Sequence, residues 1–462
     1  MQEKTLFKRY FYRFLKIITI MYSRIEDLFS FQKKCLQAMG MWPLAIERHL
    51  PKSVVCLATP LRRLFEGLML LLGLHIAILQ AKTTYDNFGG NLDDLSDSLT
   101  ATIIYSFVFF ASVYFMWSRK LLVELLHTGT HTYVHTYIHI IMLLFCCSSA
   151  FKKARMMSMV WIFSCLLGVI TWALYPLATG QRALPLRCWY PLDDKKPVIY
   201  EILYVIQFFA QLQVGLVFGN GSAIYMSFII IVCGQYDVLF CSFKNVINTA
   251  NLRSGNFNVL RKEQFQFNLS DDESNQYLYC KEEKYDLDSF RLQPTCTNNF
   301  EVELKKAIKK CVQHHQFILT TCKLLEKFYN GYCLVKSLQI TIQLCLLAFV
   351  TVNTTTSFFQ ALSLTQYLIL TMTELLMFTV YGQILTSQSL RVGEAALRSS
   401  WYLKSASLRT DFLIVLPNTL RPVILTAGTF FVMDVDRLRN VVTSAFSFLT
   451  LLQNLSDAKN QR

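Results

Sequence analysis

The chain has 462 residues, of which 53% are hydrophobic, 14% aromatic and only 16% charged, against about 25% charged residues in soluble globular proteins. A soluble surface of this size needs more charge, so the composition excludes an ordinary soluble protein and predicts a membrane protein. The formal net charge of +14 would suit nucleic acid, but the basic residues stand between long apolar runs, so topology accounts for them and no nucleic-acid partner is predicted.

The N-terminal region, residues 1–63, is strongly basic. It holds twelve Lys/Arg against four Asp/Glu, and its longest apolar stretch is too short for a signal peptide. The positive-inside rule therefore places this region in the cytoplasm.

Residues 64–240 hold four predicted spans, because a helix needs about 20 apolar residues to cross a bilayer. The apolar segments are Leu64–Leu79, Leu99–Trp117, Met157–Leu177 and Ile199–Phe240. The last one is too long for a plain span but contains no charged hairpin, so we expect one helix that projects past the bilayer. Thr132–Phe151 is also apolar, but a span there would invert every later loop, and it is assigned to the cytoplasm.

The outer halves of these spans and of the sixth carry side chains suited to line a ligand cavity. Small apolar ligands favour concave, mostly apolar sites with few polar groups. Gly168 is expected to leave room beside the indole of Trp172, one helical turn away. The predicted cavity residues are Tyr105, Phe107, Gly168, Trp172, Tyr175, Tyr204, Phe208, Met372 and Leu376.

Residues 241–330 form a predicted cytoplasmic loop followed by an anchoring helix. The polar segment 245–299 shows little periodicity and is expected to be disordered. Apolar residues recur at the helical period from Phe300 onward. Residues 331–386 then supply the fifth and sixth spans, Leu334–Val352 and Leu364–Leu385, and Glu374 within the sixth indicates a cavity or a charged partner.

Residues 387–425 are expected to form the cytoplasmic part of a seventh helix, and residues 426–462 its pore-lining part and an extracellular tail. Charges between Asp434 and Arg439 interrupt the apolar pattern, which leaves Val441–Leu455, about 22 Å of helix. Its polar groups recur on one face, so symmetric copies would line a water-filled pore with leucines as a constriction. Helix packing through small polar residues would give the same stripe. The predicted pore and gate residues are Ser447, Thr450, Leu451, Asn454 and Leu455.

The distribution of charge gives the orientation. Residues 83–97 have no Lys/Arg and four Asp, whereas residues 387–421 have five Lys/Arg against two Asp/Glu. The sequence thus predicts an all-α membrane protein with seven transmembrane helices, a cytoplasmic N-terminus and an extracellular C-terminus.

Enzyme and metal motifs give no further prediction. The chain has no phosphate-binding loop, no zinc-protease motif and no nucleophile elbow. Four histidines lie on one predicted helical stripe, but no carboxylate or thiolate stands in register with them, so no metal or cofactor is assigned. They are His127, His131, His135 and His139.

The C-terminal residues resemble those of insect odorant receptors. The similarity lies in the order and spacing of Tyr381-Gly382-Gln383, Trp401-Tyr402, Ala427-Gly428 and Phe446-Ser447-Phe448. Gly40 to Leu44 and Pro185 to Pro191 also resemble segments of that family. The C-terminal and N-terminal sequences of the family's co-receptor are not matched.

This resemblance implies a ligand-gated, non-selective cation channel of the plasma membrane of olfactory neurons. It implies a ligand-binding subunit that assembles with the obligate co-receptor into a heterotetramer in lipid, and that binds a small volatile odorant near Gly168 and Trp172. Leu451 and Leu455 would match the family's hydrophobic gate. The alternatives are a seven-span G-protein-coupled chemoreceptor, which would place its N-terminus outside, and a gustatory receptor channel, whose typical ending is absent.

Overall fold

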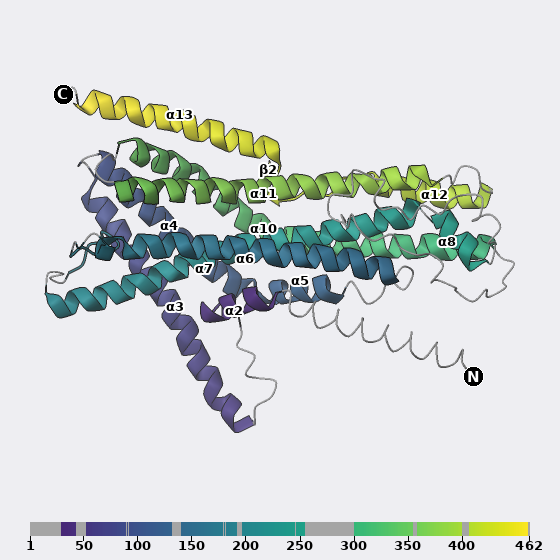
Figure 1. Ribbon diagram of the computed structural model, residues 1–462, viewed down its shortest axis with the longest axis horizontal. Helices are drawn as coiled ribbons and strands as arrows, with labels where there is room; N and C mark the ends of the chain where they lie inside the picture. Colours follow the sequence, from purple (N-terminus) through teal and green to yellow (C-terminus); the bar gives the residue numbers. More distant parts are fainter. Residues whose placement is uncertain are drawn as a thin grey trace.

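The computed structural model is a bundle of long helices (Figure 1). It describes residues 29–42, 52–88, 90, 92–131, 140–178, 180, 182–191, 196–244, 246–254, 300–353, 358–399 and 406–460. Its helices are α2 (Ser30–Ala38), α3 (Lys52–Asp86), α4 (Leu92–Trp117), α5 (Arg119–His131), α6 (Ile140–Ala178), α7 (Pro197–Lys244), α8 (Val246–Arg253), α10 (Phe300–Asn353), α11 (Phe358–Arg398), α12 (Ala406–Thr419) and α13 (Val435–Asn460).

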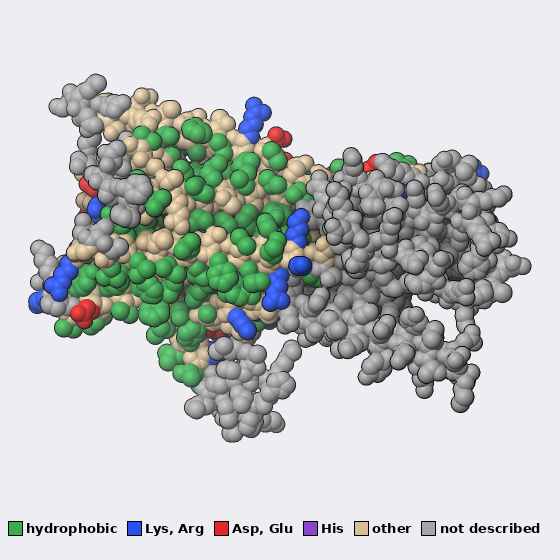
Figure 2. All heavy atoms as spheres, viewed as in Figure 1, with side chains coloured by type: hydrophobic (Ala, Val, Ile, Leu, Met, Phe, Trp, Pro, Cys, Tyr) green, Lys and Arg blue, Asp and Glu red, His purple; other side chains and the backbone are tan. Residues whose placement is uncertain are grey.

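Six of the described helices are long and apolar enough to cross a membrane, namely α3, α4, α6, α7, α10 and α11. They coincide with the first six predicted spans, which confirms that part of the prediction. Hydrophobic side chains gather over the middle of the face in Figure 2, and charged groups lie toward its two sides. Leu64, Leu68 and Leu71 of α3 are exposed, as expected of a surface that contacts lipid.

The third span extends further than its apolar core. Helix α6 is continuous from Ile140 to Ala178, so the later part of the apolar stretch 132–151 continues this helix and does not cross separately. Residues 132–139, with His135 and His139, lie outside the described residues.

Helix α7 is the centre of the bundle. It is one helix of 48 residues, which confirms the prediction of a single long helix over Ile199–Phe240. It packs against α2, α3, α4, α6, α10 and α11. Every residue from 221 to 241 is buried. A helix that is apolar on all sides belongs in such a core.

The helices around α7 project far beyond one bilayer thickness. Helix α10 has 54 residues and α11 has 41, or about 81 Å and 62 Å of helix against a hydrocarbon core of about 30 Å. The expected boundary between anchoring helix and fifth span at residue 330 falls inside α10. Helix α11 continues to Arg398, and α12 covers part of the region expected to anchor the last helix.

The polar segment 245–299 begins with an ordered helix where the sequence predicted disorder. Helix α8, Val246–Arg253, packs against α10, and its Val246 and Ala250 are buried. Residues 255–299 lie outside the described part of the chain.

A short hairpin connects α12 to α13. Strands β1 (Thr426–Ala427) and β2 (Phe431–Val432) pair antiparallel, and the turn places Gly428 at φ 63°. The Gly428 N–H donates to the Asn330 carbonyl at 3.0 Å, and the Glu326 carboxylate accepts from the Thr426 N–H at 2.9 Å. A Cβ on Gly382 would lie 2.0 Å from the Met433 carbonyl oxygen, so glycine permits α11 to pass the hairpin. Helices α10 and α11 both contact the hairpin, and they thereby position the start of α13.

The last helix is longer than predicted. Helix α13 runs from Val435 to Asn460, 26 residues, or about 39 Å, so the expectation of a helix confined to residues 441–455 is wrong. The charged residues that seemed to interrupt it form its start, because the Asp434 carboxylate accepts from the Arg437 N–H at 2.8 Å and caps the first turn. The polar stripe, and not the length, is what distinguishes α13 from the six apolar helices.

Candidate ligand pocket and pore helix

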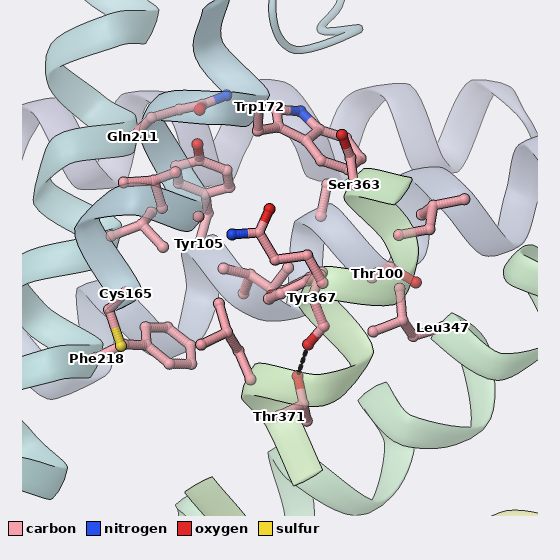
Figure 3. Close-up of a pocket in the computed structure, with 18 of the residues that line it drawn as sticks. Thr100, Tyr105, Cys165, Trp172, Gln211, Phe218, Leu347, Ser363, Tyr367 and Thr371 are labelled. Carbon is pink, nitrogen blue, oxygen red and sulfur yellow. Dashed lines mark hydrogen bonds between the residues drawn. The ribbon is translucent and has the colours of Figure 1, made fainter. Parts of the chain in front are cut away.

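A pocket of about 140 Å³ lies between α4, α6, α7, α10 and α11. Figure 3 shows Gln211 and Trp172 at one end of it and Cys165, Phe218 and Thr371 at the other. Its lining is mostly apolar and aromatic, with a few polar groups, which is the composition of sites for small organic ligands. The lining residues used below are Tyr105, Trp161, Cys165, Gly168, Trp172, Leu186, Gln211, Phe218, Gln366, Tyr367, Leu370, Thr371 and Glu374.

Helix α6 supplies one wall of the pocket. Trp161, Cys165, Gly168 and Trp172 all line it, and spacings of four, three and four residues place them on one helical face. A Cβ on Gly168 would lie 2.9 Å from Leu370 Cδ1. Leu370 of α11 therefore occupies the space that we expected this glycine to leave free beside the indole.

The loop after α6 closes one end of the pocket. The indole N–H of Trp172 donates to the Pro185 carbonyl at 3.2 Å. The side-chain amide of Gln207 accepts from the Leu186 N–H at 2.9 Å and donates to the Leu186 carbonyl at 3.2 Å. Because Gln207 and Leu186 are both buried, these paired hydrogen bonds hold the loop against the pocket.

A buried ion pair lies at the other end. Lys336 Nζ of α10 is 2.8 Å from Glu374 Oε2 of α11, and the two side chains are 1% and 4% exposed. Ser222 of α7 donates to Glu374 Oε1 at 2.6 Å, and Lys336 Nζ lies 3.6 Å from the Phe218 ring centroid. Since Glu374 also lines the pocket, three helices meet at a charged group directly beside the ligand space.

Residues that follow Lys336 and Glu374 on α10 and α11 contact α13. Ser337, next to Lys336, accepts from Arg437 Nη2 at 2.9 Å. One turn further along, Ile340 and Leu344 of α10 pack with Leu375 of α11 and with Val441 and Ala445 of α13. Helices α10 and α11 thus contact the pocket on one side and the last helix on the other.

Three of the predicted cavity residues line the pocket and six do not. Tyr105, Gly168 and Trp172 line it. Phe107 packs against the ion pair, with its ring centroid 4.3 Å from Lys336 Nζ, and Tyr175 is half-buried elsewhere on α6. The Tyr204 hydroxyl donates to the Ala173 carbonyl, Phe208 packs against Phe209, Met372 packs beside α13, and Leu376 is exposed.

Sequence reasoning missed the contributions of α7 and of most of α11. Gln211, Val214 and Phe218 form one stripe of α7, and residues 363, 367, 370 and 374 form one stripe of α11. The missed signal was helical spacing, since residues 105 and 107, or 370 and 372, stand about 200° apart on a helix and point to nearly opposite sides of it. Lys336 was also missed, although two opposite charges in neighbouring spans predict a pair.

The predicted pore residues lie on the exposed face of α13. Ser447, Thr450, Leu451, Asn454 and Leu455 are all exposed, and Val441, Ala445 and Leu452 on the opposite face pack against α10 and α11. Helix α13 lies along the edge of the bundle (Figure 1). Its polar stripe therefore points away from the rest of the described bundle.

Comparison with known proteins identifies similar sequences over most of the chain. A family model described as 7tm Odorant receptor matches residues 91–446. The chain is 40% identical to putative odorant receptor 85e of Drosophila melanogaster, over 89% of this chain and 88% of that one. It is 32% identical to odorant receptor 83a of the same species, over 94% of this chain and 96% of that one.

More distant similarity extends to a co-receptor and to solved structures. The odorant receptor coreceptor of Aedes aegypti is 22% identical over 59% of this chain and 63% of its own. The olfactory receptor OR5 of Machilis hrabei, solved in complex with eugenol, superposes with a TM-score of 0.72 at 13% identity, covering 94% of this chain and 99% of that one. This structural match shows that the two chains share a fold.

Proposed function

The chain belongs to the insect odorant receptor family, as a specific receptor and not the co-receptor, and we propose that it is the odorant-binding subunit of a ligand-gated, non-selective cation channel. The observation that carries this proposal is the mostly apolar pocket between α4, α6, α7, α10 and α11. Such a pocket suits a small volatile organic molecule. Eugenol, which is bound in the OR5 structure, is a molecule of this kind.

The proposed topology has seven transmembrane helices, with α13 as the seventh. The N-terminus is cytoplasmic and the C-terminus extracellular in the plasma membrane, in agreement with the basic N-terminal region. The proposed channel is a heterotetramer with the co-receptor. Its ion path is walled by the exposed stripe of α13 from each subunit, with Leu451 and Leu455 as a hydrophobic constriction.

The proposed coupling runs through α10 and α11. A ligand that contacts Tyr367 and Leu370 displaces α11 relative to α10, and both helices pack directly against Val441 and Ala445 of α13. A ligand can open the channel only to the extent that it binds the open arrangement more tightly than the closed one. In this proposal, the ligand binds the two arrangements with different affinity because the contacts at Glu374 and Lys336 differ between them.

The test is current recorded from cells that express this chain together with the co-receptor. We expect volatile compounds to evoke a cation current that persists when G-protein cycling is blocked from inside the cell. Cells that express this chain without the co-receptor are the control, and they should give no current. Current that disappears with the G-protein block would favour the G-protein-coupled alternative and contradict the channel.

A further inference from the structure

The pocket contains two tryptophans whose N–H groups differ in their surroundings. The Trp172 indole N–H is engaged by the Pro185 carbonyl. The Trp161 indole N–H is buried and has no hydrogen-bond partner within the described residues, although Trp161 lines the same pocket and is 6% exposed. A buried N–H donor without an acceptor is unfavourable, and such donors are rare in native structures.

Two glutamines on one face of α7 also differ in whether their polar atoms are hydrogen-bonded. Gln207 uses both ends of its amide to hold Leu186. Gln211, one turn away, lines the pocket at 4% exposure, and its Oε1 is buried without a hydrogen-bond donor. Among the described pocket-lining residues, Trp161 and Gln211 are the ones with an unsatisfied buried polar atom.

The two unsatisfied groups lie at different depths. A Cβ on Gly219 would lie 3.3 Å from Ile162 Cα, so the level of Trp161 on α6 corresponds to residue 219 of the antiparallel α7. Gln211 is eight residues from that level, or about 12 Å along the helix. A ligand that hydrogen-bonds both residues must therefore extend along the pocket, as a ring with a polar group at each end does.

We propose that Trp161 and Gln211 are the polar anchors of the odorant, and that the ligand is an oxygenated aromatic molecule with an acceptor oxygen at one end and a hydroxyl at the other. The Trp161 N–H donates to the acceptor oxygen, and the ligand hydroxyl donates to Gln211 Oε1. The rest of the molecule contacts the apolar lining. This inference rests on the proposed function and names the ligand class for the same pocket.

Four compounds on one carbon skeleton test both anchors. Ethylbenzene has neither group, acetophenone has the acceptor, para-ethylphenol has the hydroxyl, and para-hydroxyacetophenone has both. Half-maximal concentrations are measured from currents in cells that co-express the co-receptor. We expect each added group to lower the half-maximal concentration by about three- to tenfold, the effect of one net hydrogen bond.

Two variants assign each gain to its residue. Trp161→Phe keeps an aromatic ring without the N–H, and we expect it to abolish the gain from the carbonyl and keep the gain from the hydroxyl. Gln211→Leu should do the reverse. Trp172→Phe is the matched control, because the Trp172 N–H already binds Pro185, and both gains should survive in it. Each gain is a ratio within one variant, so it does not depend on expression level.

The outcomes separate this inference from the proposed function. Currents in which the carbonyl and hydroxyl give no gain, or in which both gains survive Trp161→Phe and Gln211→Leu, overturn the polar anchors and leave the channel intact. A receptor that other volatile compounds open, but that none of the four compounds opens, overturns the anchors and leaves the channel intact. The proposed function itself fails only if surface labelling detects the receptor beside the co-receptor and no volatile compound evokes a current.

Discussion

Lys336 of α10 and Glu374 of α11 form an ion pair whose two side chains are 1% and 4% exposed. A charge within a membrane-spanning segment is costly unless it is paired or solvated. Here the ammonium has a carboxylate at 2.8 Å and the carboxylate has a further donor in Ser222. The pair is therefore a fixed, neutral unit, and each member depends on the other.

Replacing one member of the pair should lower the stability of the receptor more than replacing both members. Lys336→Met leaves a buried carboxylate without its counter-charge, which costs about 3–5 kcal/mol, and we expect a large fall in the thermal midpoint of the detergent-solubilised receptor. The double variant Lys336→Met with Glu374→Leu replaces the pair by apolar groups and should recover most of that loss. The midpoint is measured by fluorescence-detected size-exclusion chromatography after heating. If the double variant is no more stable than Lys336→Met alone, the two residues do not act as a pair.

At the scale of the helix, the rotation of each helix about its own axis decides which of its side chains face the pocket. The identities and depths of the aromatic residues in the spans were readable from the sequence, and Tyr105, Gly168 and Trp172 line the pocket. Phe107 and Met372 point elsewhere because each lies two positions from a lining residue, about 200° around its helix. This rotation is fixed by how the helices pack, through contacts such as Leu370 against Gly168. The sequence of one span alone therefore does not predict it.

The orientation of α13 in this chain predicts which of its positions react with a water-soluble reagent. Ser447 lies opposite the buried face formed by Val441 and Ala445, whereas Phe446 is exposed on its flank. We expect a charged, water-soluble thiosulfonate to modify Ser447→Cys in the open heteromer and to change the current, because the proposed pore exposes the stripe to water. Phe446→Cys is the matched control and should react at least about tenfold more slowly, since a flank against protein or lipid excludes charge. Equal rates at the two positions would contradict the pore-facing stripe.

At the scale of the whole molecule, the order of apolar segments determined most of the fold. Six spans and the continuity of α7 could be predicted because about 20 apolar residues are needed to cross a bilayer, whatever surrounds them. The full lengths of α10, α11 and α13 could not, because their extensions are polar. They depend on other contacts, such as the tertiary hydrogen bond between Glu326 and Thr426 and the local cap that Asp434 gives the first turn of α13. The partner of Glu374 is different, because Lys336 lies in the neighbouring predicted span and two opposite charges in neighbouring spans predict a pair.

The central claim is that ligand binding and ion conduction occupy separate parts of one subunit, the pocket and α13. The measurement that tests it most directly compares dose–response curves and reversal potentials for one pocket variant and one α13 variant in the co-receptor heteromer. We predict that Tyr367→Ala raises the half-maximal ligand concentration about tenfold or more and leaves the reversal potential unchanged. Ser447→Lys should shift the reversal potential by repelling cations, and change the half-maximal concentration by less than about threefold. A reversal potential that moves with Tyr367→Ala and stays fixed with Ser447→Lys would contradict the account.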